Sequence, residues 1–124
     1  MRNLFLLICL IAFLPSNAQN HSKWQEWQQS ACYHKIEFRV KLERTKGKRM
    51  EWNIQFRNKY EDPITFNYGI TEDSQDYLTN MRKTLRAKEV SPPVSFFTQT
   101  ADFYVLLDKL SFSLYNNGKF IPCD

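Results

Sequence analysis

Hydrophobic and polar residues alternate strictly over two stretches near the middle of the chain. Every second side chain is apolar over residues 36–42, and the same pattern resumes over residues 50–57. A period of two places successive side chains on opposite faces of an extended strand, which the 3.6-residue period of a helix does not do. The intervening segment 45–48 contains Gly47, a residue that readily adopts positive φ. The pattern therefore predicts an antiparallel hairpin of two half-buried strands.

Further short segments repeat this alternation toward the C-terminus. Asp108 and Lys109 separate apolar residues at odd positions from apolar residues at even positions, which indicates a β-bulge or a tight turn there. Asn117–Gly118 is typical of a two-residue hairpin turn. Pro63 and the pair Pro92–Pro93 lack backbone donors and mark strand ends. The additional predicted strands cover residues 64–71, 81–86 (with Leu85 in the core), 94–98, 103–115 and 120–121.

About seven short strands and no convincing amphipathic helix predict an all-β fold, an antiparallel β-sandwich. Its core is expected to contain Trp52, Phe56 and Phe66, which occupy the apolar positions of their strands. The chain of 124 residues is long enough for one domain. That length excludes multidomain enzymes and nucleotide-binding α/β folds, and the 15% aromatic content excludes a disordered chain.

The N-terminus has the features of an export signal. Arg2 precedes an apolar run that ends at Leu14, and small residues lead to Ala18. This pattern predicts a signal peptide at residues 1–18, a polar aromatic arm at 19–33 and a β-sandwich domain at 34–124. The apolar run is too short to span a bilayer, so the mature form is expected to be secreted or periplasmic with no membrane span.

Cleavage would remove Cys9 and leave two cysteines, Cys32 and Cys123, one near each end of the mature chain. In an exported protein this arrangement favours a structural disulfide between them. A reactive thiol is the alternative, but no base or metal ligand lies beside Cys123 in the sequence.

Charge is unevenly distributed along the mature chain. Residues 35–49 contain seven basic and two acidic side chains, whereas residues 60–78 contain five acidic side chains and no basic one. Such a contrast favours either a charged partner or head-to-tail association. The alternative is a solvated surface in which Lys and Arg protect an edge strand from aggregation. The overall charge of +4 is too small to indicate a nucleic-acid partner.

No motif in the sequence indicates catalysis. The two histidines, His21 and His34, do not form a metal-binding motif, and neither a Gly-rich phosphate loop nor a nucleophile elbow is present. We therefore expect a non-enzymatic protein without a metal site or cofactor.

Aromatic residues in the polar arm provide the best functional lead. Trp24 and Trp27 lie outside any periodic core segment, and exposed indoles stack on sugars and other flat groups. Together with the outward-facing Arg39 and Arg57 they form a candidate binding set. The alternative is that the arm folds back and the two rings cover the open edge of the sandwich.

The segment 52–70 (WNIQFRNKYEDPITFNYGI) resembles a strand–turn–strand unit of immunoglobulin-like and fibronectin-III-like domains of exported bacterial proteins. The segment 84–93 (TLRAKEVSPP) is similar to a corner of the same domains. The resemblance implies an immunoglobulin-like sandwich in a small secreted protein.

These observations predict a secreted domain for binding or structural association, whose partner is an unknown protein or glycan and whose oligomeric state is open. One alternative is a carbohydrate-binding module that uses the candidate binding set. Another is a secreted inhibitor or effector that acts through a loop, for which residues 72–80 are the best candidate.

Overall fold

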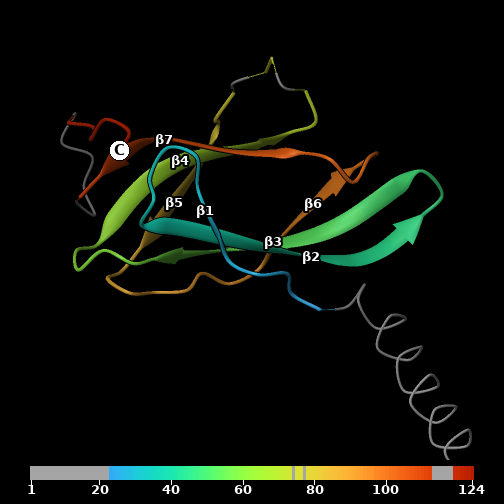
Figure 1. Cartoon of the computed structure of the whole chain (residues 1–124), viewed down its shortest axis with the longest axis horizontal. Helices are drawn as coiled ribbons and strands as arrows, with labels where there is room; N and C mark the ends of the chain where they lie inside the picture. The colour runs from blue at the N-terminus through green and yellow to red at the C-terminus, as the bar shows by residue number, and fades with distance from the viewer. Residues whose placement is uncertain (1–22, 74, 77, 113–118) are drawn as a thin grey trace, which may run out of the picture.

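The computed structural model describes residues 23–73, 75–76, 78–112 and 119–124. These residues contain seven strands and no helix, and the strands form two antiparallel sheets (Figure 1). Sheet A has the order β1-β2-β3-β6 and sheet B the order β5-β4-β7. The strands are β1 (Gln28–Gln29), β2 (Ile36–Lys46), β3 (Arg49–Asn58), β4 (Ile64–Thr71), β5 (Met81–Leu85), β6 (Val94–Thr98) and β7 (Tyr104–Ser111). The predicted all-β sandwich is confirmed, and the predicted signal peptide lies outside the described residues.

The β2–β3 hairpin joins the two longest strands and forms the centre of sheet A. Its pairing begins with Ile36 opposite Asn58 and ends with Lys46 opposite Arg49, which leaves a two-residue turn. The first turn residue, Gly47, has a φ of 65°. The predicted hairpin and the predicted role of this glycine are both confirmed, because a positive φ is needed at this point for the turn to match the strand twist.

Apolar side chains from both sheets meet in one core. The rings of Phe56 on sheet A and Phe66 on sheet B pack edge to face with their centroids 5.4 Å apart. The buried indole of Trp52 donates a hydrogen bond of 2.9 Å from Nε1 to Oγ1 of Thr98, so its only polar atom is satisfied. The buried apolar side chains are Tyr33, Ile36, Val40, Trp52, Ile54, Phe56, Ile64, Phe66, Tyr68, Leu85, Leu107 and Leu110.

The phase change in the last long strand is a β-bulge. Thr65 pairs with Ser111 and Asn67 pairs with Asp108, so β7 carries one more residue than β4 between these pairs. Lys109 lies in this interval with a φ of 54°. The bulge predicted at Asp108–Lys109 is confirmed, and it keeps apolar side chains on both sides of it directed into the core.

The structure differs from the predicted strands at both ends of the domain. The arm contributes the short strand β1, which was not expected. Residues 120–121 were expected to form a strand, but Ile121 makes only an isolated bridge to Leu110. The reason is local, because the Ile121 carbonyl accepts a hydrogen bond from the Tyr33 hydroxyl and Pro122 has no donor for a ladder. The predicted turn at Asn117–Gly118 lies outside the described residues.

A disulfide joins the arm to the C-terminal tail. Cys32 and Cys123 are bonded, with their Cα atoms 4.8 Å apart, as the sequence predicted. Around this bond, the Asp124 amide donates to the Cys32 carbonyl, and the Asp124 carboxylate accepts from the His34 amide at 2.7 Å. The two ends of the domain are therefore fixed to each other by covalent and polar contacts.

The disulfide closes a loop between residues 91 positions apart, so its loss should destabilise the fold by on the order of 4 kcal/mol. We predict that reduction lowers the melting temperature by roughly 10 °C or more, and that the oxidised protein contains no free thiol by mass spectrometry. The Cys32→Ser/Cys123→Ser variant should melt like the reduced protein and should not respond to reductant. Alkylation of both cysteines without reductant would contradict the prediction.

Gly69 on β4 is the point where the loop after β4 crosses sheet B. A Cβ atom at this position would lie 2.0 Å from the Leu78 carbonyl oxygen, so Gly69→Ala must displace the loop. We predict a loss of about 1–3 kcal/mol in the free energy of unfolding, measured by urea denaturation, with faster amide exchange in residues 78–80. Gly47→Ala is the control for exchange: the added Cβ meets no atom within 4 Å, and although the positive φ should cost it about 1–2 kcal/mol of stability, exchange in residues 78–80 should stay unchanged relative to the rest of the sheet. Wild-type stability and exchange in Gly69→Ala would disprove the close contact.

Candidate binding surface on the outer face of sheet A

The outer face of sheet A is polar because the inner face is the core. Side chains that alternate with buried residues of β2 and β3 point away from sheet B. Opposite pairs on this face include Glu37 with Arg57 and Arg39 with Gln55. The two adjacent strands β2 and β3 therefore present charged and amide side chains side by side.

The arm lies along the edge of β2. Gln28 and Gln29 pair with Phe38 and Glu37, and the Gln25 amide donates a hydrogen bond of 2.9 Å to the Val40 carbonyl. These bonds cover part of the open edge of β2, which reduces the backbone available for edge-to-edge aggregation. They also fix the positions of the two arm tryptophans relative to the sheet.

Trp24 and Trp27 stack on basic side chains of the outer face. Cζ of Arg39 lies 4.7 Å from the ring centroid of Trp24 and 4.6 Å from that of Trp27. Nζ of Lys41 lies 5.0 Å from the Trp24 centroid, and Cζ of Arg57 lies 4.4 Å from the Trp27 centroid. The order is thus Lys41, Trp24, Arg39, Trp27 and Arg57, which we call the cation–aromatic row.

Carboxylates neutralise both ends of this row. The buried carboxylate of Glu37 accepts two contacts from the Arg57 guanidinium, at 2.6 Å from Nε and 2.5 Å from Nη2, and lies 3.6 Å from Nζ of Lys59. At the other end, Lys41 forms an ion pair of 2.9 Å with Glu43. A buried carboxylate needs such partners, because an unpaired one would be costly to desolvate.

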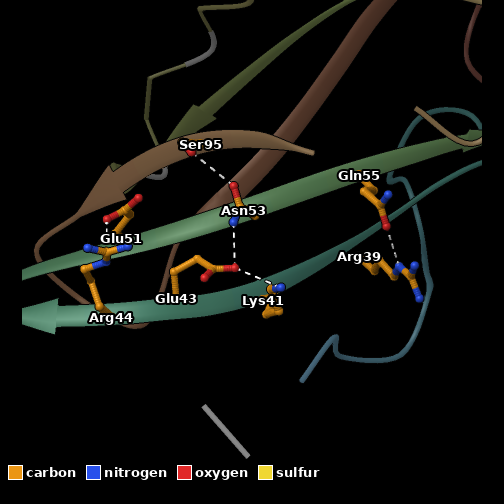
Figure 2. A network of polar contacts seen from close by, with 8 residues as sticks. All are labelled: Arg39, Lys41, Glu43, Arg44, Glu51, Asn53, Gln55 and Ser95. Atoms are coloured by element: carbon orange, nitrogen blue, oxygen red, sulfur yellow. Dashed lines mark hydrogen bonds and ion pairs between the residues drawn. The ribbon is translucent and has the colours of Figure 1, made fainter. Parts of the chain in front are cut away.

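Figure 2 shows the polar contacts at the Lys41 end. Glu43 accepts from Lys41 and from the Asn53 amide, which in turn accepts from the Ser95 hydroxyl at 3.1 Å. The hydrogen bond from Lys41, with that from Asn53, lowers the pKa of the Glu43 carboxyl below its ordinary value. Glu43 is therefore ionised at neutral pH and offsets the charge of Lys41.

Arg39 is the cation of the row without an acidic partner in the described residues. Its Nε donates to the neutral amide oxygen of Gln55 at 2.9 Å (Figure 2). Its guanidinium also contacts both indoles, so the centre of the row combines an uncompensated positive charge with two aromatic rings. This combination favours contact with flat, polar or anionic groups.

The structure brings together the four residues that the sequence singled out: Trp24, Trp27, Arg39 and Arg57. Both tryptophans are half-buried rather than free or part of the core. The arm does fold back onto the edge of β2, while its rings lie over the basic side chains. Sequence reasoning missed Lys41 as a fifth member, although its alternation with Val40 and Leu42 already placed it on the same face.

The other candidate is the loop at residues 72–80, of which the structure describes all but residues 74 and 77; Leu78 lies against Gly69 of sheet B. The loop carboxylates are engaged locally: Asp73 and Asp76 accept from backbone amides within the loop. Glu72 accepts from the amides of Gln99 and Thr100. The backbone hydrogen bonds from Thr100 and Gln99 lower the pKa of Glu72. These contacts reduce the capacity of the loop to bind a basic partner.

The residues that the structure describes show neither a metal-binding cluster nor a membrane-spanning helix. They contain no group of three or more His, Cys, Asp or Glu side chains arranged to hold a metal ion. They also contain no helix with the length and apolar character needed to cross a membrane. In comparisons with known proteins, no family model, curated protein or solved structure matches the chain.

If stacking holds the arm, Arg39→Gln should loosen it. We predict a loss of roughly 1 kcal/mol in the free energy of unfolding, since each exposed cation–π contact contributes about 0.5–1 kcal/mol, and faster amide exchange at Gln25. Arg39→Lys should be intermediate, because an ammonium cannot stack as a plane on both rings. Arg82→Gln is the control, because Arg82 contacts Asn67 on sheet B. Unchanged exchange at Gln25 in Arg39→Gln would show that the row does not hold the arm.

Proposed function

We propose that the protein is a secreted, non-enzymatic, immunoglobulin-like domain that binds a glycan partner through the cation–aromatic row. The strand order supports the immunoglobulin-like type. β3 pairs with β6 in one sheet, and β4 pairs with β7 in the other. We take β2, β3 and β4 as strands A, B and C of an immunoglobulin sandwich, and β6 and β7 as strands E and F. Immunoglobulin sandwiches likewise pair B with E in one sheet and C with F in the other.

Two observations support export. Cys32 and Cys123 form a disulfide, which persists in oxidising compartments and is rare in the cytosol. The first 18 residues have the charge, apolar run and small-residue ending of a signal peptide.

The observation that carries the proposed binding role is the cation–aromatic row itself. Trp24 and Trp27 are half-buried, so part of each residue stays accessible beside the basic side chains. Sugar rings offer flat C–H faces that pack on indoles and hydroxyl groups that accept from guanidinium donors. Arg39 supplies such donors between the two rings. A glycan chain therefore matches this surface better than a purely apolar ligand does.

A structural role for the arm is the second candidate. Its backbone pairs with β2 at Gln28 and Gln29, and the Ser30 amide donates to the Ile36 carbonyl at 3.1 Å. In that case the rings only fasten the arm over the edge of the sheet, and the partner binds elsewhere.

The two candidates differ in what Trp24→Ala and Trp27→Ala change. We predict that each substitution weakens retention on immobilised polysaccharides by about 2 kcal/mol, roughly 30-fold, as expected for an aromatic hot spot. The melting temperature should fall by several degrees, as in Arg39→Gln, because each substitution removes two cation–π contacts. Retention is measured by affinity electrophoresis against a panel of neutral and acidic polysaccharides.

Met81→Ala is the matched control, because Met81 is an exposed apolar residue of sheet B. It should retain the wild-type mobility shift. Because some stability is lost under either candidate, unchanged retention in Trp24→Ala and Trp27→Ala would favour the structural role. Failure of the wild type to bind any member of the panel would reject glycan binding.

A further inference from the structure

The tip of the β2–β3 hairpin is a second basic surface, distinct from the cation–aromatic row. It lies at the end of the molecule opposite to the C-terminus (Figure 1). Lys46, Lys48 and Arg49 are all exposed there, and the described residues place no carboxylate in an ion pair with any of them. Arg44, also exposed, is instead paired with Glu51 at 3.0 Å (Figure 2).

Bulge geometry determines which side chains share this surface. The β2–β3 register shifts between Leu42 and Arg44, after which Arg44 faces Glu51 and Lys46 faces Arg49. Without the extra residue in β2 between Leu42 and Arg44, the side chains of Arg44 and Lys46 would point to the opposite face of the sheet. The bulge therefore gathers cations on one side of the hairpin tip.

An exposed aromatic ring completes the surface. Phe97 of β6 faces Glu51 across the sheet and is 50% exposed. Cζ of Arg49 lies 3.9 Å from the centroid of its ring. This contact holds the guanidinium at a fixed position and leaves half of the phenylalanine accessible.

Two concavities adjoin this Arg49–Phe97 pair. One, of about 360 Å³, is lined by Lys46, Lys48, Arg49, Glu72, Phe97, Thr98 and Gln99. The other, of about 200 Å³, is lined by Arg44, Lys46, Arg49, Glu51 and Phe97. The larger one is within the size range of small-ligand sites. Each contains three cations and one carboxylate, so the local charge is positive in both.

We infer that these concavities bind the sulfate or carboxylate groups of an acidic polysaccharide. Lys46, Lys48 and Arg49 supply the positive charge for the anionic substituents, and the exposed half of Phe97 supplies an apolar wall for a sugar ring. Glu51 and Glu72 are already engaged, by Arg44 and by the amides of Gln99 and Thr100. Their negative charge beside the cations disfavours a lipid phosphate surface, whose anionic groups are densely packed, over a polysaccharide, whose anionic substituents are separated by sugar rings.

A second copy of the chain fits less well. The acidic residues that would complement the tip lie at 72–76, where Glu72, Asp73 and Asp76 already accept hydrogen bonds from backbone amides. Moving them onto another molecule would sacrifice those bonds. The inference takes from the proposed function only that the protein is a secreted glycan binder, and the tip is separate from the row.

The test compares wild type with the Lys46→Gln/Lys48→Gln/Arg49→Gln variant. We expect wild type to bind dextran sulfate and polygalacturonate but not neutral dextran at this site, with affinity that falls between about 50 and 500 mM NaCl. The triple variant should bind both polyanions at least about tenfold more weakly, measured by isothermal titration calorimetry. Its melting temperature should stay near that of wild type, because the altered side chains are exposed.

The matched control is Arg86→Gln/Lys109→Gln/Lys119→Gln, which removes the same charge from exposed positions elsewhere. It should bind both polyanions like wild type. Equal losses in the two triple variants would overturn the inference and indicate attraction by net charge alone. Wild-type affinity in the Lys46→Gln/Lys48→Gln/Arg49→Gln variant would also overturn the inference. If Trp24→Ala alone then lost binding, the proposed function of the cation–aromatic row would still stand. Binding to phosphatidylglycerol vesicles without binding to either polysaccharide would assign the tip to a membrane surface instead.

Discussion

Side-chain alternation in the β2–β3 hairpin is the constraint on which both the core and the candidate surface depend. Ile36, Val40, Ile54 and Phe56 are almost completely buried, so the positions between them must face away from sheet B. A one-residue shift in register would exchange the two faces and expose the core residues to water. Burial of the apolar face therefore determines indirectly that the charged side chains, including Arg39, lie on the outer face of the sheet.

Contacts of Tyr33 and the disulfide hold the two ends of the domain together. The buried hydroxyl of Tyr33 donates to the Ile121 carbonyl at 2.7 Å and accepts from the Leu110 amide at 3.3 Å. Burial raises the pKa of the Tyr33 hydroxyl, which stays neutral and keeps its proton for this bond. The disulfide next to it joins the arm to the tail. Arm, tail and β7 are thereby connected at one point, from which the arm extends along β2 toward the cation–aromatic row.

Sequence patterns predicted the elements whose signals are local. The period of two predicted β2, β3 and β4, and the phase change predicted the bulge at Asp108–Lys109. The expectation of an exported protein with two cysteines predicted the disulfide. Strand β1 escaped prediction because Gln28 and Gln29 have no apolar alternation, and only the partner strand makes them extended. Gly69 escaped for a similar reason, since the nearby Leu78 carbonyl is fixed by tertiary structure. The candidate binding set was proposed from residue type, but its stacking geometry depends on the pairing of the arm with β2, which no single segment of the sequence encodes.

Under the proposed function, the cation–aromatic row would link glycan binding to the stability of the arm. Trp24 and Trp27 already stack on Arg39, so a ligand would meet rings that are oriented before binding and would lose little entropy in ordering them. A ligand that packs on the exposed parts of the two residues would add to these contacts and stabilise the docked arm by mass action. A ligand that must displace Arg39 from between the rings would instead release the arm and expose the edge of β2. Since that edge is hydrogen-bonded to Gln25, Gln28 and Gln29, displacement would cost backbone bonds as well as stacking. The geometry therefore favours a partner that extends the row without separating its members.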